Sequence, residues 1–166
     1  MTITPEALFA YLDRLGLAHA TTAHPPFFTV EDGRDWHDRI PGLHCKNLFL
    51  RDRDGKFWLV LMPGDKRAKL GLLERRIRCA RLSFGKPEQL LEILGVTPGS
   101  VTPFALMNDV ERRLTIIVDT DLVAAETVNF HPLHNAASTT LRSADLMTFI
   151  RSLGYEPVIA NCGDEA

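Results

Sequence analysis

Four stretches of the chain carry apolar residues at the three- and four-residue spacing of a helix that buries one face. They are residues 4–15, 65–76, 87–94 and 143–152. Three of them start with a proline or with a small polar residue such as Ser143 that can cap a helix, and a glycine follows the same three within two residues. The remaining stretch, residues 65–76, combines leucines with lysines and arginines, which predicts an amphipathic helix with a basic face.

Strand-forming residues fill most of the sequence between these helices. Segments rich in β-branched and aromatic residues predict strands at residues 18–23, 46–51, 56–61, 102–107, 114–119 and 123–129. Asp54-Gly55 supplies the backbone freedom of a tight turn, so residues 46–61 predict a hairpin. Pro25-Pro26 forbids a helix after the first strand and indicates an extended loop, while Asp119-Thr120-Asp121 predicts a turn between the last two strands.

Helices at both ends and strands in the middle predict an α+β fold with a mixed sheet. The chain shows no repeat, linker or low-complexity tract. Its 166 residues are enough to bury a core without disulfides or metal ions. We therefore expect a single domain over residues 1–166.

Composition and charge restrict the binding partners and the cellular compartment to be expected. Lys and Arg number 19 and Asp and Glu number 21, so the net charge of −2 excludes a general attraction to nucleic acid. The three cysteines, Cys45, Cys79 and Cys162, lack paired spacing, which is typical of a reducing compartment. The N-terminus lacks a targeting signal, and no run approaches the about 18 apolar residues of a membrane span. We expect a soluble, cytoplasmic protein with no membrane partner.

Two polar insertions interrupt apolar, strand-forming sequence. Cys45-Lys46-Asn47 precedes Leu48-Phe49-Leu50, and Asn129-Phe130-His131-Pro132-Leu133-His134-Asn135 follows an apolar segment. Burying a polar group without a partner costs about 1–3 kcal/mol, so such residues need a reason to be there. A bound polar ligand on the sheet would supply one.

Each residue of these insertions also has a structural interpretation. Alternation would point Lys46 to the face opposite Asn47 or to the mouth of the strand, and it is either a solvated strand end or a ligand contact. His131 can hydrogen-bond a ligand and Asn135 can orient it, or the two can merely shape a loop. His131 and His134 have a spacing seen in zinc sites, but no Cys, Asp or Glu cluster completes a tetrahedral site.

A glycine- and proline-rich loop and a basic stretch are further candidates. Backbone amides of residues 95–103 can donate to a carbonyl or a developing oxyanion, or the loop can be a rigid connector. The basic residues can seat phosphates or form a solvated helix face; they are Lys66, Arg67, Lys69, Arg75, Arg76, Arg78 and Arg81. Cys45 follows His44 but is interpreted as a buried or incidental thiol, and no GxSxG motif indicates a serine nucleophile.

Motifs spread over most of the chain carry a family resemblance. They are His24-Pro25-Pro26-Phe27-Phe28-Thr29-Val30, Cys45-Lys46-Asn47-Leu48-Phe49-Leu50, Gly99-Ser100-Val101-Thr102-Pro103, and the insertion from Asn129 to Asn135 followed by Thr139-Thr140. In this order and spacing they resemble the YbaK-like aminoacyl-tRNA editing domains, and among these the free-standing prolyl-tRNA editing proteins. The resemblance covers residues 15 to about 153.

The resemblance implies a curved mixed sheet flanked by helices, and a site without a metal or organic cofactor. It implies that Lys46 and Asn47 face the aminoacyl-adenosine end of the substrate, that residues 99–103 lie against the ester carbonyl, and that His131 lines the amino-acid pocket. The expected catalytic residues are Lys46, Gly99, Ser100 and Val101. The expected substrate-binding residues are Phe28, Asn47, Pro103, His131 and Asn135, and the expected tRNA contacts are Arg51, Lys66 and Arg81.

The implied activity is trans-editing, in which alanine mischarged onto tRNA(Pro) is removed by hydrolysis. A synthetase pocket shaped for proline rejects the smaller alanine by only about 1–3 kcal/mol, so a separate hydrolytic site is needed. Because the ester is already activated, a positioned water and oxyanion donors suffice. The expected partners are the alanine-charged acceptor end of tRNA(Pro) and, transiently, prolyl-tRNA synthetase.

Three alternatives remain at this point. The protein can act on cysteine or another small amino acid esterified to tRNA, since relatives in the same superfamily do so. It can bind an aminoacyl-RNA or a nucleotide without hydrolysing it. It can also be a zinc-dependent hydrolase that uses His131 and His134.

Overall fold

Strands and helices follow one another along the whole chain. The computed structural model describes residues 2–27, 29 and 31–164. The α-helices are α1 (Pro5–Arg14), α2 (Leu70–Ile77), α3 (Pro87–Leu94), α4 (Thr120–Ala124) and α5 (Ser143–Ser152). The strands are β1 (His19–Ala23), β2 (Leu43–Asp52), β3 (Phe57–Pro63), β4 (Leu82–Phe84), β5 (Leu114–Asp119), β6 (Thr127–Phe130), β7 (Ala137–Arg142) and β8 (Val158–Ala160). Short 3₁₀ helices span Glu31–Trp36, Pro98–Ser100 and Pro103–Asn108.

The strands form a mixed sheet in the order β1-β7-β6-β2-β3-β5-β8, with β4 pairing to β2 off this path. β6 runs parallel to β2, and β5 runs parallel to both β3 and β8. The other neighbours are antiparallel, including the β2–β3 hairpin. The mixed sheet flanked by helices confirms the predicted class.

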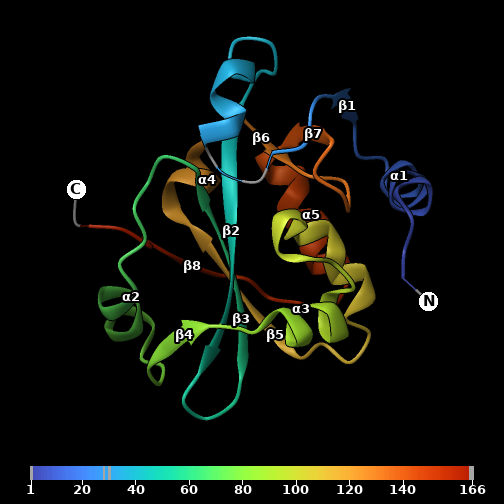
Figure 1. Cartoon of the computed structure of the whole chain (residues 1–166). Coiled ribbons are helices and arrows are strands. Elements are labelled where there is room, and N and C mark those ends of the chain that lie inside the picture. Colours follow the sequence, from blue (N-terminus) through green and yellow to red (C-terminus); the bar gives the residue numbers. More distant parts are fainter. Residues whose placement is uncertain (1, 28, 30, 165–166) are drawn as a thin grey trace.

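The helices divide unequally between the two faces of the sheet. The larger apolar cluster joins α1, α3 and α5 to sheet residues such as Leu59 and Leu61. The smaller cluster packs Leu73 of α2 against Val60 and Met62, the alternate residues of the same strand. Figure 1 shows α2 and the C-terminus on one side of the central hairpin and α1 and the N-terminus on the other. No helix of the described residues is long and apolar enough to cross a membrane.

The outer edge of β2, opposite β3, is only partly occupied. β6 pairs with Leu43 and His44 at the start of β2, and β4 pairs with residues 50–52 at its end. Between these stretches the outer edge of β2 pairs with no strand of the described chain. The Phe49 carbonyl still accepts from the Gly85 amide just after β4, so the sheet splits beside residues 45–48.

The predicted helices 4–15, 87–94 and 143–152 and the β2–β3 hairpin are confirmed within two or three residues. In the turn of the hairpin, Asp52 Oδ1 accepts hydrogen bonds from the Asp54 and Lys56 amides. The predicted strands 18–23 and 114–119 correspond to β1 and β5.

Other predictions about elements were wrong, and local capping explains two of them. Residues 102–107 form a 3₁₀ helix instead of a strand, because Thr102 Oγ1 accepts from the Phe104 amide and Pro103 occupies the first turn. The predicted turn at 119–121 and the start of the predicted strand 123–129 form α4, because the Asp119 side chain caps it.

Further differences lie at element ends. The predicted helix 65–76 starts only at Leu70, because the Lys69 amide donates to the Cys162 carbonyl. Ser143 does not cap α5 from outside: it is the first helical residue, and its hydroxyl donates to the Ala125 carbonyl. Strands β4, β7 and β8 were not predicted.

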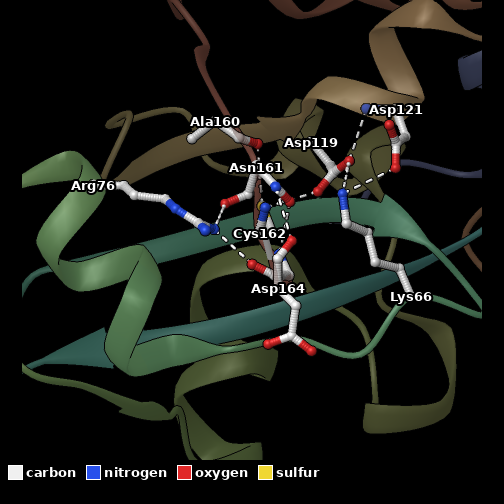
Figure 2. Close-up of polar contacts among 9 residues, drawn as sticks. Lys66, Arg76, Asp119, Asp121, Ala160, Asn161, Cys162 and Asp164 are labelled. Carbon is white, nitrogen blue, oxygen red and sulfur yellow. Dashed lines mark hydrogen bonds and ion pairs between the residues drawn. The ribbon is translucent and has the colours of Figure 1, made fainter. Parts of the chain in front are cut away.

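A polar network ties residues 160–164 to the rest of the fold (Figure 2). Asp119 is fully buried; its Oδ1 accepts from Lys66 Nζ at 2.9 Å and its Oδ2 accepts from the Cys162 amide at 2.8 Å. Arg76 donates from one nitrogen to the carbonyls of Asn161 and Gly163. We call Lys66, Arg76, Asp119, Asp121 and residues 160–164 the C-terminal clasp.

Candidate active site

A cavity of about 270 Å³ lies where the outer edge of β2 is free. Its walls come from β2, the loop at residue 27, the 3₁₀ helix Pro98–Ser100, and the ends of β6 and β7. Lys46, Asn47, Gly99, Val101 and His131, all of them predicted site residues, line it. The structure thus brings together the two polar insertions of the sequence.

Lys46 is partly buried at this cavity. No hydrogen-bond or ion-pair partner is found for its ammonium group among the described residues. Burial lowers the pKa of Lys46 below its ordinary value of 10.5, and the charge of Asp65 offsets part of this effect. An ammonium group that has lost water and gained no protein partner is suited to receive an anionic or polar ligand.

Asn47, the next residue of β2, also lines the cavity. Its Nδ2 donates to the Val101 carbonyl at 2.9 Å, which fixes the chain just after Pro98–Ser100. Its Oδ1 is buried and has no hydrogen-bond partner among the described residues. Buried polar atoms without a partner are rare in folded proteins, and this one lies on a residue of the cavity wall.

His131 presents an acceptor rather than a donor. Its Nδ1 lies 2.9 Å from the Ala137 carbonyl, which can only accept, so Nδ1 carries the hydrogen. Burial lowers the pKa of His131 by more than the hydrogen bond to Ala137 raises it, so the pKa lies below its ordinary value of 6.5. The ring is therefore neutral at pH 7, and Nε2 keeps its lone pair.

Aromatic rings form one side of the cavity. Phe27 stacks on His24 with a centroid separation of 3.7 Å, and both rings lie near His131. His37 and His44 form a second stack at 4.2 Å, and His44 Nε2 donates to the Ile40 carbonyl. Burial lowers the pKa of His44, so this ring too favours the neutral form.

The cavity wall carries no carboxylate among the described residues that line it. Within the described ranges, no group of three or more His, Cys, Asp or Glu side chains is placed to hold a metal ion. Of the two histidines in the zinc alternative, His131 donates from Nδ1 to the Ala137 carbonyl, and His134 Nδ1 accepts from the Ala136 amide. Burial raises the pKa of Cys45, another lining residue, to about 12, so its thiol stays protonated and is a poor nucleophile.

Other predicted site residues lie behind the wall. The Ser100 amide donates to the Thr97 carbonyl. Ser100 is buried and is not one of the residues that line the cavity. Pro103 is buried at the start of its 3₁₀ helix. Asn135 Nδ2 donates to the Phe27 carbonyl at 3.2 Å and so supports the ring that lines the cavity. Phe28 lies outside the described residues.

The structure places the three predicted tRNA contacts in two different regions. Arg51 and Arg81 line a second cavity of about 350 Å³ together with Asp52, Arg53 and Ser83. Lys66 instead belongs to the C-terminal clasp, where Asp119 and Asp121 occupy its ammonium group. The structure therefore gives Lys66 a role in the fold, and we do not retain it as a phosphate contact.

Several lining residues were not predicted. Phe27 and Asn129 belong to motifs that the sequence singled out, but the site residues predicted from these motifs were Phe28 and His131. His44 was noted only as the neighbour of Cys45. Ser138 also lines the cavity, and a serine in a β-rich stretch carries no signal that would have found it.

Comparison with known proteins places this geometry in a family. The family model described as aminoacyl-tRNA editing domain matches residues 24–149. The chain is 35% identical to "Prolyl-tRNA synthetase associated domain-containing protein 1" of Danio rerio, over 93% of this chain and 85% of that protein. It is 31% identical to "Prolyl-tRNA editing protein ProX" of Acetoanaerobium sticklandii, over 90% of this chain and 92% of that protein.

Solved structures share the fold. One of them, described as a candidate trans-editing enzyme for prolyl-tRNA synthetase, aligns with a TM-score of 0.75 over 99% of both chains at 19% identity. The matched family region contains the whole wall of the first cavity.

Proposed function

The chain belongs to the aminoacyl-tRNA editing domain family, and from that premise we propose that it hydrolyses the ester of alanine mischarged onto tRNA(Pro). Relatives that carry prolyl-tRNA editing in their names support tRNA(Pro) as the RNA. The proposal includes action in trans, on tRNA released by prolyl-tRNA synthetase, and at most a transient contact with that enzyme.

The observation that carries the proposal is the Lys46 ammonium group, which has no partner among the described residues and lies at a small cavity where no described lining residue is a carboxylate. The substrate end is a nucleotide with a phosphate, ribose hydroxyls and an aminoacyl ester. In our proposal Lys46 holds the terminal nucleotide through charge-assisted hydrogen bonds. The cavity of about 270 Å³ suits a small aminoacyl group better than a large one.

The chemical step needs little from the protein. Water attacks the ester carbonyl, the bond to the ribose oxygen breaks, and the ribose oxygen regains a proton. We assign the segment from Gly99 to Val101 to the carbonyl, held in place by Asn47, and His131 to the boundary of the amino-acid pocket. The free ribose hydroxyl beside the ester orients the water, so neither a covalent nucleophile nor a metal ion is required.

The second cavity is the proposed seat of the acceptor stem. Arg51 follows Lys46 by five residues on β2, which places it roughly 17 Å along the strand. Arg51 and Arg81 can each contact backbone phosphates there. Arg81→Ala should weaken binding of the tRNA and make it less sensitive to salt, whereas a loss confined to turnover would contradict this assignment.

The deciding experiment is release of amino acid from tRNA(Pro) charged separately with alanine, cysteine and proline. We expect rapid loss of alanine alone, equally fast with and without a chelator. Loss of cysteine instead would change the substrate assignment, and sensitivity to the chelator would support the zinc alternative. Protection of every ester against spontaneous hydrolysis would identify a binding module.

A further inference from the structure

Ser138 contributes a buried hydroxyl to the cavity wall, and the buried ring of His24 determines the direction in which this hydroxyl donates. Ser138 is 4% exposed and His24 is 7% exposed. Ser138 Oγ lies 2.8 Å from His24 Nε2, and His24 Nδ1 lies 2.8 Å from the Pro25 carbonyl. The stack on Phe27, with 2° between the ring planes, holds the His24 ring in this orientation.

The chain of hydrogen bonds fixes the direction of each donor. The Pro25 carbonyl can only accept, which selects the His24 tautomer with its hydrogen on Nδ1. In this tautomer Nε2 accepts, and the Ser138 hydroxyl gives it its only hydrogen. The Ser138 oxygen is left with lone pairs, so it can offer the cavity an acceptor and no donor.

His131 provides a second acceptor on the same face of the sheet. Asn129 of β6 is paired in register with Thr140 of β7. Two residues further along the antiparallel pair, His131 and Ser138 come opposite each other, and both line the cavity. His131 Nε2 carries a lone pair because Nδ1 donates to Ala137.

We propose that Ser138, with its hydrogen held by His24, and His131 receive the α-ammonium group of the aminoacyl ester. This inference rests on the proposed function, because it assigns one group of that substrate. An ammonium group needs acceptors, and no carboxylate among the described lining residues provides one. Asn47 Oδ1 is a third acceptor on the lining residues, but Asn47 is the neighbour of Lys46, whose positive charge repels an ammonium group. The neutral acceptors at Ser138 and His131 are therefore the place that we assign to it.

The test measures binding rather than turnover, so that it does not depend on hydrolysis. The probes are acceptor-stem minihelices of tRNA(Pro) that end in 3′-amino-3′-deoxyadenosine acylated with alanine or with propionic acid. They differ only in the α-ammonium group. We expect the wild-type protein to bind the alanyl form about 10- to 100-fold more tightly, as hydrogen bonds to a charged group imply.

Ser138→Ala should remove most of this preference while leaving the affinity for the propionyl form unchanged. His24→Phe keeps an aromatic ring on Phe27 but frees the Ser138 hydrogen, and should reduce the preference by a smaller factor. Thr139→Val is the matched control: it removes a fully buried hydroxyl that bonds Thr21 on the opposite face of β7, and should change neither affinity.

Equal affinity of the wild type for the two minihelices would overturn the inference, and so would an equal loss for both in Ser138→Ala. Either result can occur in a protein that still deacylates alanyl-tRNA(Pro). Conversely, a protein that prefers the alanyl form but never releases alanine would refute the proposed function alone.

Discussion

Lys46 and Lys66 are both partly buried lysines, yet the fold treats them in opposite ways. Lys66 Nζ lies 2.9 Å from Asp119 and 3.0 Å from Asp121. Burial lowers the pKa of Lys66, but the two carboxylates outweigh burial and raise it above 10.5. At Lys46 burial prevails and lowers the pKa, and no partner is found among the described residues.

The same contrast extends to the groups around each lysine. In the C-terminal clasp the buried Asp119 carboxylate has both oxygens engaged. In the cavity Asn47 Oδ1 has no hydrogen-bond partner among the described residues, and His131 Nε2 keeps its lone pair. Satisfied polar groups hold a fold together, whereas unsatisfied ones carry a cost that a ligand can remove. The difference separates a structural network from a binding site.

The largest expected effect comes from breaking the clasp at its centre. Asp119→Ala should lower the free energy of unfolding by about 3–5 kcal/mol, because it leaves Lys66 without its buried partner and the Cys162 amide without an acceptor. Urea denaturation measures the loss. Asp121→Ala is the control, since its side chain is 67% exposed and its removal should cost no more than about 1 kcal/mol. Unchanged stability of Asp119→Ala would remove the basis of the comparison.

The same substitution at the two lysines sharpens the comparison. Lys46→Met should lower kcat/KM for deacylation about 10- to 100-fold and leave the unfolding free energy unchanged or higher, since an unpaired charge is removed. Lys66→Met should lower the unfolding free energy by about 1–3 kcal/mol and leave kcat/KM of the folded protein unchanged. Full deacylation by Lys46→Met at both saturating and subsaturating substrate would show that Lys46 is not a substrate contact.

The smallest expected effect is a difference in pH dependence. Burial lowers the pKa of His131 in the folded state, so this ring stays neutral when the pH falls below 6.5. In the unfolded chain the ring takes up a proton at the ordinary pKa of 6.5. Stability should therefore fall as pH decreases below 6.5, and His131→Asn should weaken this fall. The raised pKa of Lys66 has the opposite sign, so its contribution should persist below pH 10.5 and disappear as pH rises further.

Urea titrations at acid, neutral and alkaline pH measure both limbs. We expect His131→Asn to change the slope of the acid limb only. Lys66→Met should lower stability at acid and neutral pH alike and change the slope of the alkaline limb only. A change of slope on the other limb in either variant would mean that the two regions are coupled.

The elements that the sequence predicted correctly have strong local signals. Pro87 and Gly95 bound α3, and Gly95 adopts the left-handed conformation expected of a residue that ends a helix. The failures come from conflicts between signals. Thr102-Pro103 is a capping signal inside a β-rich segment, and capping prevailed. β4 and β8 are three residues long, so pairing with distant strands determines them.

The candidate site was predictable where polar residues interrupt apolar strands, as at Lys46, Asn47 and His131. It was not predictable where the decisive fact is a partner far away in sequence. Lys66 lies in the same kind of basic stretch as Arg81, and only contact with Asp119, 53 residues away, assigns it to the fold. The role proposed for Ser138 depends on its hydrogen bond with His24, which is 114 residues away.

The gap on the outer edge of β2 also determines how readily this part of the strand opens. Backbone groups that are paired on both edges of a sheet open rarely, whereas a stretch paired on one edge opens with a smaller cost. Amide hydrogen exchange should therefore be faster at residues 45–48 than at the other strand residues of the β2–β3 hairpin. A substrate that fills the cavity would slow this exchange, so β2 would report occupancy of the site directly, even in a variant that cannot turn over.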